Sequence, residues 1–157
     1  MKKRKYVIAI SISVAVIFFS VAISFVAYLW NNPITFSIRT NWSINFIGYN
    51  VIYHVDGSPQ NHPNLRELKY FTVLECKDFK DVRNKVAWKD DANENVSSAV
   101  LKLASELNVN SNYIPDFSKS YKYFTTTTDG IDTLYLIYMP SKNCVYVIED
   151  INHASTE

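Results

Sequence analysis

Three side chains that can bind a metal ion lie close together in this chain: His54 and Asp56 stand two residues apart, and His62 follows. On a β-strand the first two would share one face. Two imidazoles and a carboxylate can hold zinc and leave one position open for water, as hydrolytic zinc centres do. The pattern therefore offers the alternative of a small metal-dependent hydrolase. The spacing matches no specific ligand signature, and Asp56 before Gly57 is also typical of a turn.

A second group of side chains suits binding rather than catalysis. Tyrosine and threonine recur at every other position near the C-terminus, at Tyr121, Tyr123, Thr125 and Thr127. Side chains at this spacing share one face of a strand, and aromatic rings with hydroxyls are common where proteins bind proteins or glycans. We predict that this face contacts a partner. The alternative is that both residue types are present because they favour strands. No nucleophile elbow or phosphate-binding loop occurs, and we expect no cofactor.

The segment that positions these residues relative to a membrane is residues 6–30. It contains no charged side chain and follows a basic cluster over residues 2–5. As a helix its 25 residues would rise about 37 Å, more than the roughly 30 Å hydrocarbon core of a bilayer. Because basic ends stay in the cytoplasm, we predict a cytoplasmic tail (1–5), a transmembrane anchor (6–30, Tyr6 to Trp30) and an extracytoplasmic domain (31–157).

The same segment has an alternative interpretation as a cleaved signal peptide, with Ser20-Val21-Ala22 as the cleavage site. Cleavage there would leave an apolar tail on the mature protein, whereas a retained anchor places Tyr28 and Trp30 at the outer interface. We therefore favour the anchor. Ser20 and Ser24 have the spacing of small residues that pair membrane helices, so a homodimer through the anchor is a further option.

The predicted domain is slightly acidic and contains both cysteines. It has twelve basic and fifteen acidic residues, a formal charge of −3, which argues against a nucleic-acid surface. Cys76 and Cys144 lie in a compartment where disulfides persist. We predict a disulfide between them, which would close a loop of 67 intervening residues and contribute about 4 kcal/mol in the chain-entropy model. The alternative is two buried thiols.

The first half of the domain is expected to form strands. Apolar and polar residues alternate over 34–46, and the alternation shifts phase beside Gly48 before continuing over 47–55. Such a shift predicts a β-bulge at that glycine. Turn residues follow at 56–59, and residues 68–76 predict a further strand.

The second half combines helices with a hairpin meander. Apolar spacing predicts a short helix over 78–88 and a longer one that starts near Asp91-x-x-Glu94 and presents residues 96, 100, 103 and 107 to a sheet. Three strands follow over 121–128, 131–139 and 144–151, the first two joined by the turn Asp129-Gly130. The middle strand is apolar on both faces, so we expect both faces to be covered.

These elements predict an α+β fold: an N-terminal transmembrane helix, then one small domain whose antiparallel sheet is packed by one or two helices. An anchored domain without a catalytic constellation acts most often by contact. We therefore expect a non-enzymatic, single-pass envelope protein that binds a protein or glycan partner at the membrane surface, with the hydrolase of His54, Asp56 and His62 as the alternative.

Overall fold

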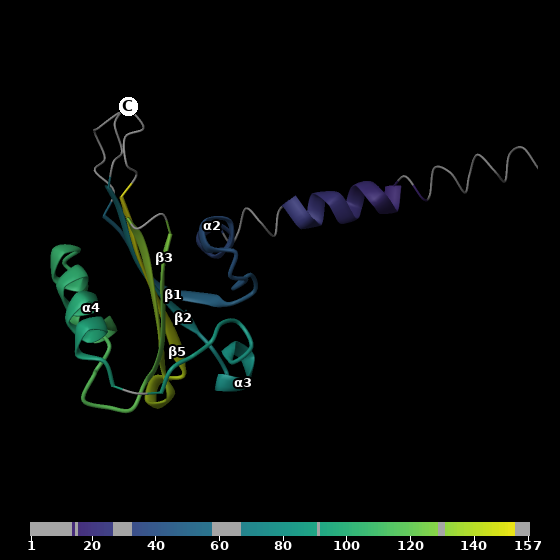
Figure 1. Cartoon of the computed structure of the whole chain (residues 1–157). Helices are drawn as coiled ribbons and strands as arrows, with labels where there is room; N and C mark the ends of the chain where they lie inside the picture. The colour runs from purple at the N-terminus through teal and green to yellow at the C-terminus, as the bar shows by residue number, and fades with distance from the viewer. Residues whose placement is uncertain are drawn as a thin grey trace, which may run out of the picture.

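The fold is built on one five-stranded antiparallel sheet (Figure 1). The computed structural model describes residues 14, 16–26, 33–57, 67–90, 92–128 and 131–152. The strand order is β1-β2-β5-β4-β3. The strands are β1 (Asn50–Asp56), β2 (Glu67–Glu75), β3 (Lys122–Thr128), β4 (Asp132–Met139) and β5 (Cys144–Asn152). The predicted α+β class and the C-terminal meander β3-β4-β5 are confirmed, while the predicted turn at 129–130 lies outside the described residues.

Each face of the sheet has its own apolar core. Along β5, Tyr146 and Ile148 belong to one core, and Val145 and Val147, which alternate with them, belong to the other. The helix α4 (Glu94–Glu106) covers the first face, which we call the α4 face. The helices α2 (Pro33–Trp42) and α3 (Phe79–Val82) cover the second, the α2 face. Both faces of β4 are buried, as its apolar sequence predicted.

The prediction of a strand over 34–46 is wrong, because residues 33–42 form the helix α2. Thr35 and Ile38, three residues apart, are the buried positions, whereas Phe36 is exposed. This helical spacing places one side of α2 against the sheet. Alternation of isoleucine and phenylalanine in so short a segment fits either structure, and packing onto the sheet decides between them.

The predicted β-bulge exists, but at a different residue. The β1–β2 register shifts between Val51 and Tyr53, which leaves Ile52 as the extra residue, while Gly48 lies in the preceding turn with φ 94°. Val51 therefore packs in the core of the α2 face, and Tyr53 packs in the core of the α4 face. Because of the inserted residue, Val51 and Tyr53 face different cores although they are two positions apart in the sequence.

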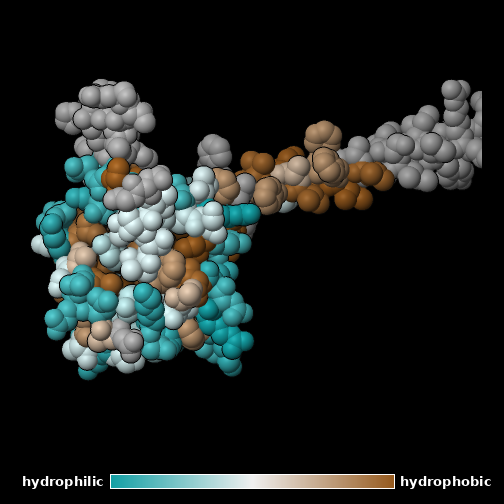
Figure 2. Space-filling model, viewed as in Figure 1, coloured by the Kyte–Doolittle hydropathy of each residue, from teal (hydrophilic) through white to brown (hydrophobic). Residues whose placement is uncertain are grey.

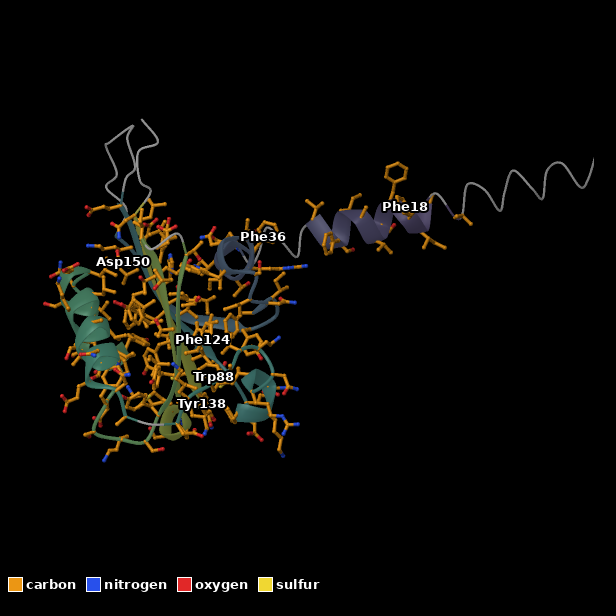
Figure 3. All side chains as sticks on the ribbon, viewed as in Figure 1. Phe18, Phe36, Trp88, Phe124, Tyr138 and Asp150 are labelled. Carbon is orange, nitrogen blue, oxygen red and sulfur yellow. The ribbon has the colours of Figure 1, made fainter. Side chains whose placement is uncertain are left out.

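The helices on the two faces begin at defined caps. The side chain of Asn93 accepts a hydrogen bond from Val96 N and starts α4, so the predicted helix is confirmed with a different cap. Asp91, part of the predicted start, lies outside the described residues. The predicted short helix over 78–88 is present as the single turn of α3, capped by Asp78. Figure 3 shows Trp88 and Tyr138 beside α3, where their ring centroids are 6.5 Å apart.

An apolar helix at residues 14 and 16–26 projects away from the α2 side of the domain (Figures 1 and 2). Its large apolar side chains are 57–73% exposed. Among the residues that the structure describes, no helix is both long and apolar enough to cross a membrane. Much of the predicted segment 6–30 lies outside the described residues.

Candidate functional site

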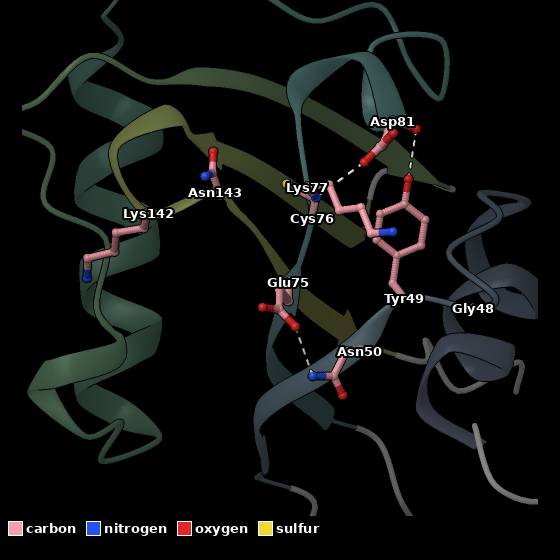
Figure 4. Close-up of a pocket in the computed structure, with 9 residues that line it drawn as sticks. All are labelled: Gly48, Tyr49, Asn50, Glu75, Cys76, Lys77, Asp81, Lys142 and Asn143. Carbon is pink, nitrogen blue, oxygen red and sulfur yellow. Dashed lines mark hydrogen bonds between the residues drawn. The ribbon is translucent and has the colours of Figure 1, made fainter.

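An open groove of about 880 Å³ lies at the end of the sheet where β1 begins and β2 ends (Figure 4). The turn before β1, the start of α3 and the β4–β5 connection form its walls. Its lining combines charged, amide and aromatic side chains with backbone: Gly48, Tyr49, Asn50, Glu75, Cys76, Lys77, Asp81, Lys142 and Asn143. Side chains of both charge signs meet in this groove, so it presents hydrogen-bond donors and acceptors together.

Local hydrogen bonds hold the groove in shape. Tyr49 donates its hydroxyl to the backbone carbonyl of Asp81 at 2.7 Å, which ties the β1 turn to α3. The carboxylate of Asp81 accepts hydrogen bonds from the backbone N–H groups of Lys77 and Asp78 at 3.2 and 3.3 Å. Across the strands, Asn50 donates its side-chain amide to Glu75 at 3.0 Å. These bonds make the groove a formed feature rather than a gap between loops.

Two titratable groups of the groove, Cys76 and Tyr49, have pKa values raised above their ordinary values. Burial, together with Cys144 and Asp81, raises the pKa of the Cys76 thiol to about 12, so this thiol is not a thiolate near neutral pH. Burial and the charge of Asp81 likewise raise the pKa of Tyr49. Neither Cys76 nor Tyr49 is therefore poised as a nucleophile or base near neutral pH.

The two lysines of the groove have different environments. Lys142 lies at one end in Figure 4, where its ammonium donates to the backbone carbonyls of Asn112 and Ile114, both at 3.3 Å. Among the described residues, no carboxylate forms an ion pair with Lys77. Lys77 is exposed and is thus a cation that a ligand in the groove can meet.

The predicted metal site is only partly within the described residues, because His62 lies outside them. His54 has its Nδ1 2.9 Å from the hydroxyl of Thr72, and its ring stacks on Tyr70. Burial lowers the pKa of His54, and the charge of Asp56 opposes this shift. No group of three metal-binding side chains occurs in the part of the chain that the structure describes. His54 is engaged in packing at the β1–β2 pair.

The predicted binding face of tyrosines and threonines is not a single exposed surface. Tyr121 and Tyr123 are only 7% and 5% exposed, because α4 covers them. Their hydroxyls meet the start of α4: the backbone N–H of Asn93 donates to Tyr121, and its side-chain amide donates to Tyr123. Thr125 is half-buried and Thr127 is exposed. The tyrosines therefore position a helix, and only the threonine end of β3 reaches solvent.

The two cysteines are free, buried thiols, which differs from the predicted disulfide. Cys144 lies opposite Glu75 in the β2–β5 register, and residues that lie opposite each other share a face. The residue after Glu75, Cys76, therefore points to the other face. Accordingly Cys144 belongs to the core of the α4 face and Cys76 to that of the α2 face.

Sequence reasoning missed one buried charge, Glu149 of β5, which is 3% exposed. Its carboxylate accepts hydrogen bonds from the indole N–H of Trp42 at 2.7 Å and from the amide of Asn41 at 3.3 Å. Burial raises the pKa of Glu149, and these two hydrogen bonds oppose the shift. Glu149 follows Val145 and Val147 at every other position of β5, so the three side chains share one face. This spacing could have indicated that Glu149 is buried.

Comparisons with known proteins supply no family for this chain: no family model, curated protein or solved structure matches it.

Proposed function

We propose that this chain is a single-pass membrane protein whose residues 6–30 anchor the domain 31–157 outside the cytoplasm, where the domain binds a protein or glycan partner. The observation that carries the proposal is the apolar helix at residues 14 and 16–26. Its large apolar side chains are 57–73% exposed, and uncharged residues continue its sequence in both directions. Such a surface is favourable in a lipid environment and costly in water.

The groove supports the binding part of the proposal. It is open, lined by both charge signs, and includes the exposed Lys77. Its tyrosine and cysteine have raised pKa values, which makes contact a better use of the groove than acid–base chemistry. A partner segment that brings a carboxylate to Lys77 and a donor to Glu75 would match the charges present.

The anchor is tested by fractionating cells and washing the membranes at alkaline pH. The chain should remain in the membrane pellet, and Phe18→Arg combined with Ile23→Arg should release it, because arginine is costly within a bilayer. Phe36→Arg, on the exposed side of α2, is the matched control and should not release it. An unmodified chain in the soluble fraction would contradict the anchor, and an intact mass that lacks residues 1–22 would support the signal peptide instead.

The binding site is tested by photo-cross-linking in intact cells. A cross-linker at Lys77 should capture one envelope component reproducibly, whereas one at Lys102, exposed on α4, should not. Equal capture from both positions would contradict the groove as the binding site. Stoichiometric zinc in the purified chain, lost in His54→Ala, would instead favour the hydrolase.

A further inference from the structure

In the part of the chain that the structure describes, the β3 edge of the sheet has backbone groups that no hydrogen bond engages. The direction of these groups follows from a short bridge at the start of the strand, where Tyr123 exchanges two backbone hydrogen bonds with Lys89, at 2.8 and 2.9 Å. Tyr123 therefore directs its N–H and C=O away from β4. Because these directions alternate along a strand, Thr125 and Thr127 direct theirs the same way, while Thr126 bonds to β4.

The bridge ends at Tyr123 and does not reach the outward groups of the two threonines. Among the described residues, no backbone hydrogen bond engages the outward N–H or C=O of Thr125 or Thr127. Figure 2 shows the surface over this part of β3 as a pale patch, neither strongly hydrophilic nor hydrophobic. Two donors and two acceptors thus lie in a row on an uncharged edge.

This edge lacks the features that usually prevent strand pairing. Proteins protect edge strands with charges, prolines or bulges. The other edge strand, β1, has a bulge at Ile52 and carries His54 and Asp56. The segment Phe124–Thr128 of β3 has no charge, no proline and no register shift. The two edges of the same sheet therefore differ, and β3 is the one open to another strand.

We propose that the β3 edge pairs antiparallel with the β3 edge of a second copy of this chain, which joins two sheets into one of ten strands. The positions of the available backbone groups select one register, in which Thr126 lies opposite Thr126 of the second copy. Thr125 then lies opposite Thr127 of the second copy, and all four outward groups of each chain are satisfied by four hydrogen bonds. Threonine meets threonine throughout the centre of this register, and no like charges oppose each other.

The same symmetry is compatible with one membrane. An antiparallel pair of this kind has its two-fold axis perpendicular to the sheet, so corresponding faces of both copies lie on the same side. The helix α2 packs on the α2 face and directly follows the segment that we propose as the anchor. Both anchors would therefore leave the ten-stranded sheet from the same face and enter the same bilayer.

The size of the ladder explains why the pairing depends on the anchor, and in this respect the inference rests on the proposed function. Four backbone hydrogen bonds form a smaller contact than the stable interfaces of soluble proteins, which bury about 1,200–2,000 Å². Two copies held in one membrane meet at a raised effective concentration, which favours a weak pairing. We expect dimers in membranes at protein densities where the chain without its anchor would be monomeric.

Cysteine cross-linking of the full chain in native membranes tests the register. In Thr126→Cys the two facing Cα atoms would be about 4.5 Å apart, within the range of a disulfide. Mild oxidation with copper–phenanthroline in air should give a covalent dimer that a reductant reverses. The matched controls are Thr125→Cys and Thr127→Cys. In each of these variants the Cα atoms of the two equivalent cysteines would lie about 8 Å apart, beyond the range of a disulfide. The unsubstituted chain, with both thiols buried, should stay monomeric.

A second variant tests the backbone ladder. Thr127→Pro added to Thr126→Cys removes one outward N–H but no bond to β4, so cross-linking should fall at least tenfold while the unfolding midpoint changes little. The proposal is overturned if Thr126→Cys stays monomeric in membranes, or if Thr125→Cys or Ile52→Cys cross-links equally well. The membrane fractionation is scored separately: a membrane-bound chain without the Thr126→Cys dimer contradicts the pairing alone.

Discussion

At the scale of single residues, Glu149 is the most informative side chain. It is a buried carboxylate, and its hydrogen-bond donors, Trp42 and Asn41, both come from α2. A buried charge is costly unless it is well paired, so the ionised form of Glu149 makes the docking of α2 depend on these two donors. The protonation state of Glu149, which lies on the sheet, therefore affects how α2 packs against the sheet.

The pH dependence of stability follows from the sign of this shift. Burial raises the pKa of Glu149 in the folded state above its ordinary value of 4.5. Its stabilising contribution is therefore fully present below that value and is lost as the pH rises through the raised pKa. Glu149→Gln keeps an acceptor for Trp42 without the charge, so its unfolding midpoint should exceed that of the unsubstituted chain at pH 8 and match it near pH 4. Thermal unfolding followed by circular dichroism measures both.

The control for this prediction is Glu67→Gln, since Glu67 is exposed on the neighbouring strand β2. It should leave the difference between pH 8 and pH 4 unchanged. A Glu149→Gln variant that is less stable than the unsubstituted chain at pH 8 would show that the ionised carboxylate is a net stabilising group.

The two cysteines make a second prediction at this scale. Both thiols are buried, and burial is the main cause of their raised pKa values. A maleimide should therefore leave the native chain unmodified at pH 7 and add two adducts after unfolding, which intact mass spectrometry counts. A chain that gains no adduct in denaturant, but two after reduction, would contradict the free thiols and restore the disulfide.

At the scale of elements, the N-cap residue Asn93 both starts α4 and attaches its beginning to β3. Asn93 accepts from Val96 N and contacts the hydroxyls of Tyr121 and Tyr123 on β3. We expect Asn93→Ala to cost about 0.5–2 kcal/mol, the range of a lost cap, and so to lower the unfolding midpoint by several degrees. Asn93→Asp keeps the capping oxygen and should lose less. Equal losses in the two variants would show that the cap contributes little.

The elements also show what the sequence alone can predict here. Strands β2 to β5 and the helix α4 have long or regular patterns, and all were predicted within a few residues. The helix α2 was not, because its buried positions are Thr35 and Ile38, and a buried threonine carries no apolar signal. The position of the bulge was also missed, since alternation from Ile47 to Val55 passes through Ile52 without a visible break.

The candidate site was harder to predict than the fold for a related reason. The groove collects Tyr49, Glu75, Lys77 and Lys142 from three separate parts of the chain, and no local spacing indicates that these parts meet. The tyrosines of β3 were recognised as unusual, but their burial depends on where α4 packs. Of the predicted binding face, only Thr125 and Thr127 take part in a contact that we propose, the pairing of two β3 edges. They take part through their backbone groups and not through their side chains.

At the scale of the whole molecule, the domain and the apolar helix are separate in their packing. The large apolar side chains of residues 14 and 16–26 are well exposed, and none of them belongs to either core. A chain that starts at residue 31 should therefore keep the unfolding midpoint of the full chain within a few degrees, measured in the same detergent. A large fall in the midpoint would show that the N-terminal segment packs on the domain.

The extra residue in β1 has a consequence for cooperativity. Val51 enters the core under α2, and Tyr53, just past the bulge, enters the core under α4 and stacks on Tyr113. Loosening either core displaces the same strand and so weakens the other. The two layers should accordingly unfold in a single transition, with identical midpoints for probes placed on opposite sides of the sheet.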